Sequence, residues 1–386
     1  MSFLGLVGIL LGLVALPFVS RQMSRTRFAI FMAAYLAHIG AAVVYYFYVL
    51  TAGGDSDIYY YDELRIYRQE FAFGTVFIVW VVQSLKEFLG GTYLDYFLVF
   101  QAVGFWGIAL LMRTFDEMYE GSGARSSSLL YVVLFLPGLH FWTAAIGKDA
   151  ILFFGVCLTT WAAIRIQRRQ LAFAAGALLV LLVRPHIAAI AFASLGVALL
   201  FARESPRIVR FLLIGGLAFG LFMMIGTVRS TYNVDVSDAD SMSDFFQRME
   251  NVAQSSSGGN TVVIGSFPYR LFSLLLRPFF IDAEGPMGMI TSLENVAFLF
   301  IYLWLLWHWR AVVALFRKVA FVRYATTFAL FVMILLAVVY YNVGLGLRQR
   351  TMFLPGLLCL FVAVRLTTQI GRQRSAEAPA VPDYAE

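Results

Sequence analysis

Two carboxylates, Asp55 and Asp57, follow Gly53-Gly54 at the end of an apolar segment and precede three tyrosines. Oxygen ligands at this spacing could hold a divalent cation such as Mg²⁺ or Mn²⁺. Either carboxylate could instead act as a general base that deprotonates an acceptor hydroxyl. A solvated acidic loop without chemistry is the alternative interpretation of the pair.

A second polar pair, Lys148-Asp149, lies in a tight turn between two apolar segments. An aspartate near the N-terminus of a helix is electrostatically favoured, so one interpretation is a helix cap beside a lysine. The other is a base beside a cation that binds phosphate. His140 lies two turns earlier and is a candidate for substrate contact, although a lone histidine in a helix bundle more often satisfies a structural hydrogen bond.

Arg184-Pro185-His186 interrupts an apolar stretch and divides it into two short segments. Proline disfavours helix at the preceding residue and frees backbone groups at the turn. An arginine held at such a break suits bidentate recognition of a phosphate, and His186 is a candidate catalytic residue beside it. Contact of Arg184 with lipid headgroups is the alternative.

Two further arginine pairs complete the set of candidate binding residues. Residues 268–278 predict a short interfacial helix with proline near each end, and Arg270, Ser273 and Arg277 share one stripe of it. This stripe could bind a lipid-linked phosphate or only anchor the helix among headgroups. Arg348 and Arg350 follow a glycine-containing loop and precede the last apolar segment, where they create a focus of positive charge.

The elements that carry these residues are membrane helices. Hydrophobic residues make up 61% of the chain, charged residues only 13%, and the mean hydropathy is +0.79. Apolar runs of this length must be helical in lipid, because every backbone group needs an internal partner there. We predict an all-α polytopic membrane protein of about eleven transmembrane helices: residues 3–19, 28–50, 93–112, 128–146, 150–165, 171–183, 187–202, 209–228, 287–307, 320–340 and 351–366.

The loops predict the orientation of these helices. Arginine and lysine gather in alternate loops, which the positive-inside rule assigns to the cytoplasm. The N-terminus is then outside and the C-terminus cytoplasmic, and residues 71–89 form an interfacial or re-entrant helix on the outer surface. This distribution also explains the basic pI of 9.3, so the charge does not indicate nucleic-acid binding.

The chain is predicted to form one transmembrane domain over residues 1–366, with short interfacial helices on its outer face. Its main outer loops cover 51–92 and 229–286, and residues 367–386 form a cytoplasmic tail of disordered composition. Cys157 and Cys359 lie within predicted spans, where small packing residues are expected rather than a disulfide.

This topology brings all of the candidate motifs to the outer boundary of the membrane. Charged groups at helix ends that face a bundle interior are costly unless they are paired or used. The convergence of carboxylates, arginines and a histidine at one boundary therefore indicates a functional site.

The layout of residues 28–366 resembles bacterial polytopic polysaccharide polymerases and related integral-membrane glycosyltransferases of the C-type superfamily. The resemblance implies about a dozen helices in the bacterial cytoplasmic membrane, and a sugar donor on a polyprenyl phosphate or diphosphate. It implies a glycan or lipid-linked acceptor, and contact with membrane lipids and export machinery. Asp55 and Asp57 match the acidic residue of the early outer loop, and five arginines match those that bind the carrier phosphates: Arg184, Arg270, Arg277, Arg348 and Arg350.

The outer loop over 230–286 is modest for such a polymerase, and no motif separates a polymerase from a ligase or a single-sugar transferase. The mechanism we expect is deprotonation of the acceptor by Asp55, Asp57 or Asp149, with arginines stabilising the departing phosphate. A transporter or flippase for a lipid-linked or anionic substrate is the main alternative. A non-catalytic partner in polysaccharide export is a third.

Overall fold

The computed structural model describes residues 2–16, 25–67, 71–120, 133–201, 265–339 and 342–377, with a few single positions between 238 and 263. Every regular element in these ranges is helical. In chain order they are α1 (Phe3–Leu13), α3 (Arg25–Ala52), α4 (Asp55–Tyr61), α5 (Thr75–Leu89), α6 (Tyr93–Glu120), α8 (Pro137–Thr143), α9 (Lys148–Ile164), η2 (Ile166–Arg168), α10 (Gln170–Val183), α11 (Pro185–Leu200), α14 (Phe267–Leu276), α15 (Gly285–Trp307), α16 (Trp309–Lys318), α17 (Ala320–Val339), α18 (Val343–Gln349), η3 (Arg350–Met352) and α19 (Leu354–Glu377).

Five of the described helices are long and apolar enough to cross a membrane: α3, α6, α15, α17 and α19. A sixth candidate is the pair α8 and α9 taken together. These helices fit the predicted all-α multi-pass membrane protein, but the predicted number of eleven spans is not confirmed. The apolar helices α1, α10 and α11 have 11, 14 and 16 residues, and the predicted span 209–228 lies outside the described residues.

Two predicted boundaries differ from the structure. In the described part of the segments expected at 128–146 and 150–165, α8 has only seven residues, and α8 and α9 meet at a bend of 115° and together make one candidate span. Glycine at position 147 begins the new helix, and its positive φ of 156° suits a residue without a side chain. The last span also continues as helix to Glu377, into the segment predicted as a disordered tail.

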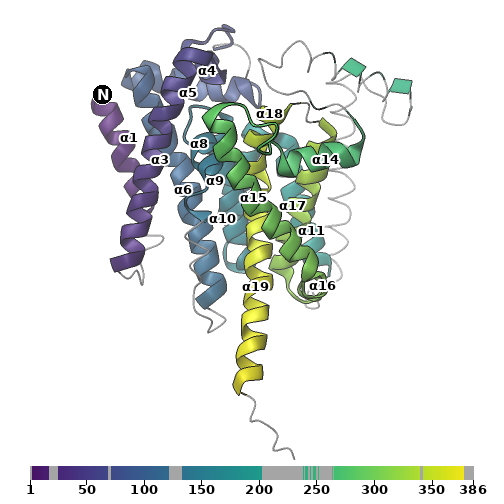
Figure 1. Cartoon of the computed structure of the whole chain (residues 1–386). Coiled ribbons are helices and arrows are strands. Elements are labelled where there is room, and N and C mark those ends of the chain that lie inside the picture. Colours follow the sequence, from purple (N-terminus) through teal and green to yellow (C-terminus); the bar gives the residue numbers. More distant parts are fainter. Residues whose placement is uncertain are drawn as a thin grey trace, which may run out of the picture.

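The helices place two sets of connections at opposite ends of the bundle. Figure 1 shows α4, α5, α14 and α18 at one end, whereas α16 and the end of α19 lie at the other. The segments 71–89 and 268–278, predicted as short outer helices, are thus found as α5 and α14 at the same end. Helix α5 packs against α4 and α10, and the Gly74 amide donates to the Leu182 carbonyl at 2.9 Å.

Helix α6 lies at the centre of the N-terminal half and packs against α1, α3 and α9. Helix α9 in turn packs on α10 through two glycines. A Cβ at Gly176 would lie 2.8 Å from the Gly155 carbonyl oxygen, and one at Gly155 would lie 3.0 Å from the Gly176 carbonyl oxygen. Small residues at such a contact let two helix backbones approach closely. Cys157 and Cys359 are both buried and free, as the sequence predicts.

A buried carboxylate, Glu117, connects α6, α9 and the start of α10 near the C-terminal ends of α6 and α9. Glu117 on α6 accepts hydrogen bonds from the Arg113 Nε at 3.1 Å, the Trp161 indole at 3.1 Å and the Arg169 guanidinium at 3.0 Å. These partners come from α6, α9 and the turn after η2. A buried charge is tolerated when it is paired and hydrogen-bonded in this way, so the basic turn at 165–169 has a structural role.

The glycine contact between α9 and α10 gives a stability test. Gly176→Ala would force a methyl group against backbone, which cannot move aside as a flexible side chain can, and should cost about 1–3 kcal/mol. Gly40→Ala is the matched control, because a Cβ at Gly40 meets nothing within 4 Å. Thermal unfolding of the purified variants in one detergent should show a lower midpoint for Gly176→Ala alone. Equal midpoints would contradict the close contact.

Candidate functional site

Arg348 joins two aspartates that are far from it in the sequence. Its Nη1 lies 2.5 Å from Asp55 Oδ2, and its Nε forms an ion pair with Asp149 Oδ2. The side chain of Arg348 is 17% exposed, that of Asp149 6% and that of Asp55 46%. One guanidinium on α18 therefore ties α4 and α9 together, with a buried and an accessible carboxylate on either side.

Three helix N-termini bring these groups together. Asp55 is the first residue of α4 after Gly54, and Lys148-Asp149 begin α9 after Gly147. Arg184 is the N-cap of α11, because Pro185 can occupy a first helical position but disfavours helix at the residue before it. The N-terminus of a helix presents free backbone amides and the positive end of the helix dipole. This arrangement favours a bound anion.

Lys148 and Arg184 extend the pairs around Arg348 into a charged cluster, which we define as Asp55, Lys148, Asp149, Arg184 and Arg348. The charges of Lys148 and Arg184 act on Asp55, and those of Asp149 and Arg348 act on Arg184. Three cations and two carboxylates give the cluster one excess positive charge.

Two buried polar atoms of the cluster have no hydrogen-bond partner in the described structure: Arg184 Nε and Asp149 Oδ1. Buried polar atoms in native proteins are nearly always paired, so the unpaired donor of Arg184 and the unpaired acceptor of Asp149 need an explanation. A substrate that carries both an anionic group and a hydroxyl would satisfy both atoms. The charged cluster thus has the character of a binding site rather than of a closed structural network.

The electrostatics of the charged cluster keep its pairs ionised. Burial alone would raise the pKa of Asp55, but the adjacent Arg348 guanidinium, with Lys148 and Arg184 further away, lowers that pKa below its usual value. Burial opposes the charge of Arg348, yet Asp149 and Asp55 raise its pKa well above normal. Burial lowers the pKa of Arg184, whereas the paired aspartates raise that of Arg348. The charge of Arg184 is therefore more costly to hold than that of Arg348 when no anion is bound.

Two tyrosines lie near the charged cluster: Tyr45 of α3 and Tyr59 of α4. Tyr59 is fully buried, and the charges of Asp55, Arg348 and Asp149 all act on its phenol. Its ring lies against the start of α9, where a Cβ at Gly147 would come within 3.2 Å of it. Burial raises the pKa of Tyr59, so the phenol remains neutral. The sequence indicated tyrosines near the carboxylates but not which of them would face the site.

Asp57 does not join the charged cluster. Its Oδ2 accepts the Gly54 amide at 3.2 Å and its Oδ1 accepts the Tyr93 hydroxyl at 2.9 Å, so it caps α4 and ties that helix to α6. Asp55 faces Arg348 instead. The two carboxylates thus have different partners, and the Mg²⁺ or Mn²⁺ site expected of them stays a prediction. No group of three or more potential metal-ligating side chains occurs in the part of the chain that the structure describes.

The two candidate histidines differ in their surroundings. His140 is buried, and its Nδ1 lies 3.0 Å from His38 Nδ1 inside the bundle, while its Nε2 contacts the Leu134 carbonyl. His140 therefore makes structural hydrogen bonds inside the bundle, which is the alternative to substrate contact that the sequence left open. His186 lies in the first turn of α11, half-buried beside Arg184. No hydrogen bond joins it to Asp55 or Asp149 in the described ranges.

The other predicted arginines hold neighbouring helices in place. Arg350 is buried and donates to the Leu274 carbonyl at 2.6 Å, the Arg277 carbonyl at 2.5 Å and the Asn295 side chain. It therefore satisfies the end of α14 and connects it to α15. Arg277, the C-cap of α14, pairs with Asp282 at 2.5 Å and with the Tyr269 hydroxyl at 2.9 Å. Arg270 lies in the first half of α14.

Sequence reasoning missed one carboxylate, Glu294. It is 9% exposed and belongs to α15, a candidate membrane span in which it is the sole charged residue. An ionisable residue within a span is a functional hypothesis by default. That rule could have found Glu294, but a search confined to helix ends passes over a charge at the tenth of the 23 residues of a helix.

Removal of the central guanidinium should destabilise the protein. Arg348→Ala leaves Asp149 buried without its partner, and the loss of one member of a buried ion pair costs about 3–5 kcal/mol. The double variant Arg348→Ala/Asp149→Asn should recover part of this loss, because no buried charge is left unpaired. Thermal unfolding midpoints test this order, with Arg310→Ala at an exposed position as control. A midpoint of Arg348→Ala equal to that of the control would contradict a buried pair.

Comparison with known proteins identifies no relative. No family model matches the chain, and neither the curated proteins nor the solved structures give a match. The resemblance to membrane polysaccharide polymerases accordingly stays a prediction from the layout of the sequence.

Proposed function

We propose that the protein transfers a glycosyl group from a polyprenyl-phosphate-linked or diphosphate-linked donor at the outer face of a bacterial cytoplasmic membrane, as in polysaccharide polymerisation. The observation that carries the proposal is the charged cluster, in which Arg184 and Lys148 remain after Arg348 has paired with Asp55 and Asp149. A site for a phosphate needs such an excess of cations.

The cations bind and stabilise the leaving phosphate. Arg184 offers a planar fork of donors with an unpaired Nε, and Lys148 offers a point charge at the N-terminus of α9. Donors fixed in a water-poor site stabilise a developing negative charge more than water does, because they need no reorganisation during the reaction. The chain's own contribution to the reaction is thus largely electrostatic.

Asp55 is the carboxylate that an acceptor can reach. An acceptor hydroxyl oxygen forms a bond to the anomeric carbon while the bond from that carbon to the phosphate oxygen breaks. The proton passes to Asp55, and the phosphate leaves with the bonding electron pair. Asp149 is only 6% exposed, so we assign it to holding the Arg348 guanidinium and, through its unpaired Oδ1, to binding a substrate hydroxyl, and we assign the role of base to the more exposed Asp55.

A transporter or flippase is the second candidate, and one observation favours it. Transporter sites often lie at discontinuous helices whose N-termini face an anionic substrate. The 115° break between α8 and α9 places the start of α9 at the charged cluster in such a manner. Both candidates require an anionic ligand, and they differ in whether a glycosidic bond forms.

Arg184→Ala tests the role of the cluster in transfer. Loss of one donor to a developing charge should lower turnover by about 10²–10³-fold, while the protein still inserts into the membrane. The measurement is the amount of surface polysaccharide and lipid-linked oligosaccharide in a deletion strain complemented with each variant. Arg168→Ala, an exposed arginine in η2, which follows the C-terminal end of α9 whereas Lys148 and Asp149 begin that helix, is the control.

Single lipid-linked units should accumulate on the outer side of the membrane in the deletion strain and with Arg184→Ala, but not with wild type or Arg168→Ala. Units that remain on the cytoplasmic side would favour the flippase. Wild-type polysaccharide with Arg184→Ala would remove Arg184 from the site.

Asp55→Asn tests the acceptor base. Because the Asp55 side chain is 46% exposed, the amide should change the unfolding midpoint little, yet transfer should fall by about 10²–10⁴-fold. Asp57→Asn is the matched control two residues away, since Asp57 only caps α4 and binds Tyr93. Equal transfer rates for the two asparagine variants would exclude Asp55 as the base.

A further inference from the structure

Two buried histidines from different helices meet inside the bundle. His38 of α3 is 0% exposed and His140 of α8 is 4% exposed. Their Nδ1 atoms lie 3.0 Å apart, and the two rings are tilted by 59°, so they meet at their edges and do not stack. A contact of this length leaves no room for a water molecule between the two nitrogens.

The other nitrogen of each ring fixes where its hydrogen must be. His38 Nε2 lies 3.1 Å from the Gln101 carbonyl oxygen, and His140 Nε2 contacts the Leu134 carbonyl oxygen. A carbonyl oxygen only accepts hydrogen bonds, so each Nε2 must carry a hydrogen. A neutral imidazole has one N–H group, which leaves the Nδ1 of each ring as a bare acceptor.

Two neutral rings therefore cannot make all of these contacts at once. Two acceptors that face each other at 3.0 Å repel, and their burial away from water strengthens the repulsion. One added proton removes this conflict, because it turns one Nδ1 into a donor to the other. The three contacts then have the three N–H groups that they need.

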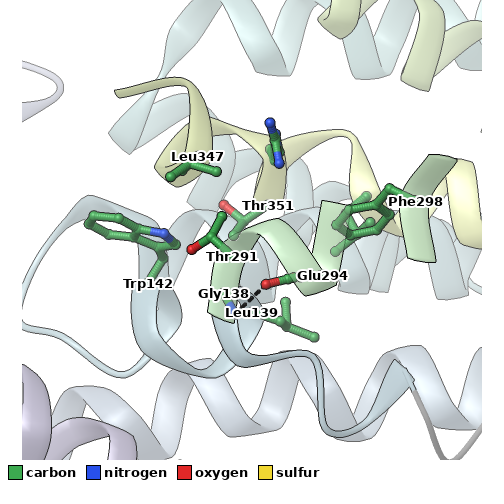
Figure 2. Close-up of a pocket in the computed structure, with 10 residues that line it drawn as sticks. Gly138, Leu139, Trp142, Thr291, Glu294, Phe298, Leu347 and Thr351 are labelled. Carbon is green, nitrogen blue, oxygen red and sulfur yellow. Dashed lines mark hydrogen bonds between the residues drawn. The ribbon is translucent and has the colours of Figure 1, made fainter. Parts of the chain in front are cut away.

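The surroundings leave this proton to the two rings. A Cβ at Gly104 of α6 would lie 3.2 Å from His38 Nε2, so α6 closes over that side of the pair. In the described ranges, the charge that acts on His38 is that of His140. Ionisable groups on the helices packed around α3 and α8 have other partners: Tyr35 and Ile9, Arg27 and Asp116, Asp95 and Thr92, Glu117 and Arg113, Asp149 and Arg348, Arg350 and Asn295, and Glu294 and the Gly138 amide (Figure 2), while Lys148 belongs to the charged cluster.

We propose that His38 and His140 together form a buried binding site for one proton, which joins α8 to α3. The proton comes from water, forms one N–H bond and returns to water when that bond breaks, so no electron is transferred. Once it leaves, two N–H groups remain for three contacts, and one contact must open. Because α8 precedes the break after which Lys148 and Asp149 begin α9, proton release loosens the helix that leads into the charged cluster.

Nitrogen NMR of the full chain in lipid nanodiscs, with isotope-labelled histidine, tests the proposal. The chain has four histidines, and His186→Asn and His308→Asn identify the signals of the buried pair by elimination. In the acid part of the pH range over which the protein stays folded, the pair should show three N–H groups and a scalar coupling between the two Nδ1 atoms across the shared hydrogen. Toward alkaline pH it should lose one proton, and the signals of both rings should change together.

His140→Asn gives a matched variant, because its amide nitrogen can take the place of Nδ1 and donate to His38 without a charge. Hydrogen exchange of the α8 amides, compared with an unstructured chain at the same pH, measures how firmly α8 is held. In the wild type this protection should fall by about tenfold when the proton leaves, whereas in His140→Asn it should not depend on pH. His308→Asn, at the N-cap of α16, is the control and should behave as the wild type does.

Two N–H groups in total at every pH would overturn the proposal, with or without a coupling, because the pair would then be neutral. Four N–H groups would overturn it as well, since both rings would then be charged. So would α8 protection that varies with pH in His140→Asn as much as in the wild type. The count of N–H groups in the wild type decides the matter even if His140→Asn does not fold, because the pair is identified by elimination.

Discussion

The ion pairs of Arg348 are the interaction on which the described site depends. They join residues as far apart as 293 positions, and they do so where water is scarce. Transfer of a guanidinium and a carboxylate out of water is costly, and their attraction offsets this cost only with close geometry. The pairs therefore give α4, α9 and α18 one shared geometry. Lys148, which begins α9, is held in place by that geometry as well.

The sequence led us to expect the residues of the charged cluster at one boundary because lipid restricts what a charge at a helix end can do, and the structure pairs three of them. Asp55, Lys148, Asp149, Arg184 and Arg348 come from separate segments, and an orientation derived from loop arginines was enough to assign them to one boundary. The direct pairing of Arg348 with Asp55 and Asp149 was not predictable. It depends on the angle at which short helices meet, which hydropathy does not contain.

The residues that the structure separates from the cluster show a second limit. Asp57 differs from Asp55 only in facing another side of a seven-residue helix, and that choice is made by Gly54 and Tyr93. Arg350 differs from Arg348 in the same manner, since it turns toward the end of α14. Charge and proximity along the chain were equal for each pair, so sequence alone could not assign one member to structure and the other to the site. The predicted number of spans is not confirmed for a related reason, because a short apolar run does not reveal whether its helix is straight or broken.

The close contact between Gly155 and Gly176 has a consequence at a distance from where it occurs. Helices α9 and α10 form a hairpin, and the contact fixes the spacing of its two arms. Lys148 and Asp149 begin one arm, and Arg184 follows the end of the other. Because neither glycine has a side chain, α9 and α10 lie close together, and this spacing sets the distance between the charged groups at the start of α9 and Arg184 after the end of α10. Substitutions at those glycines should therefore change the size of the ligand that fits between the charged groups, without any change to the charged residues themselves.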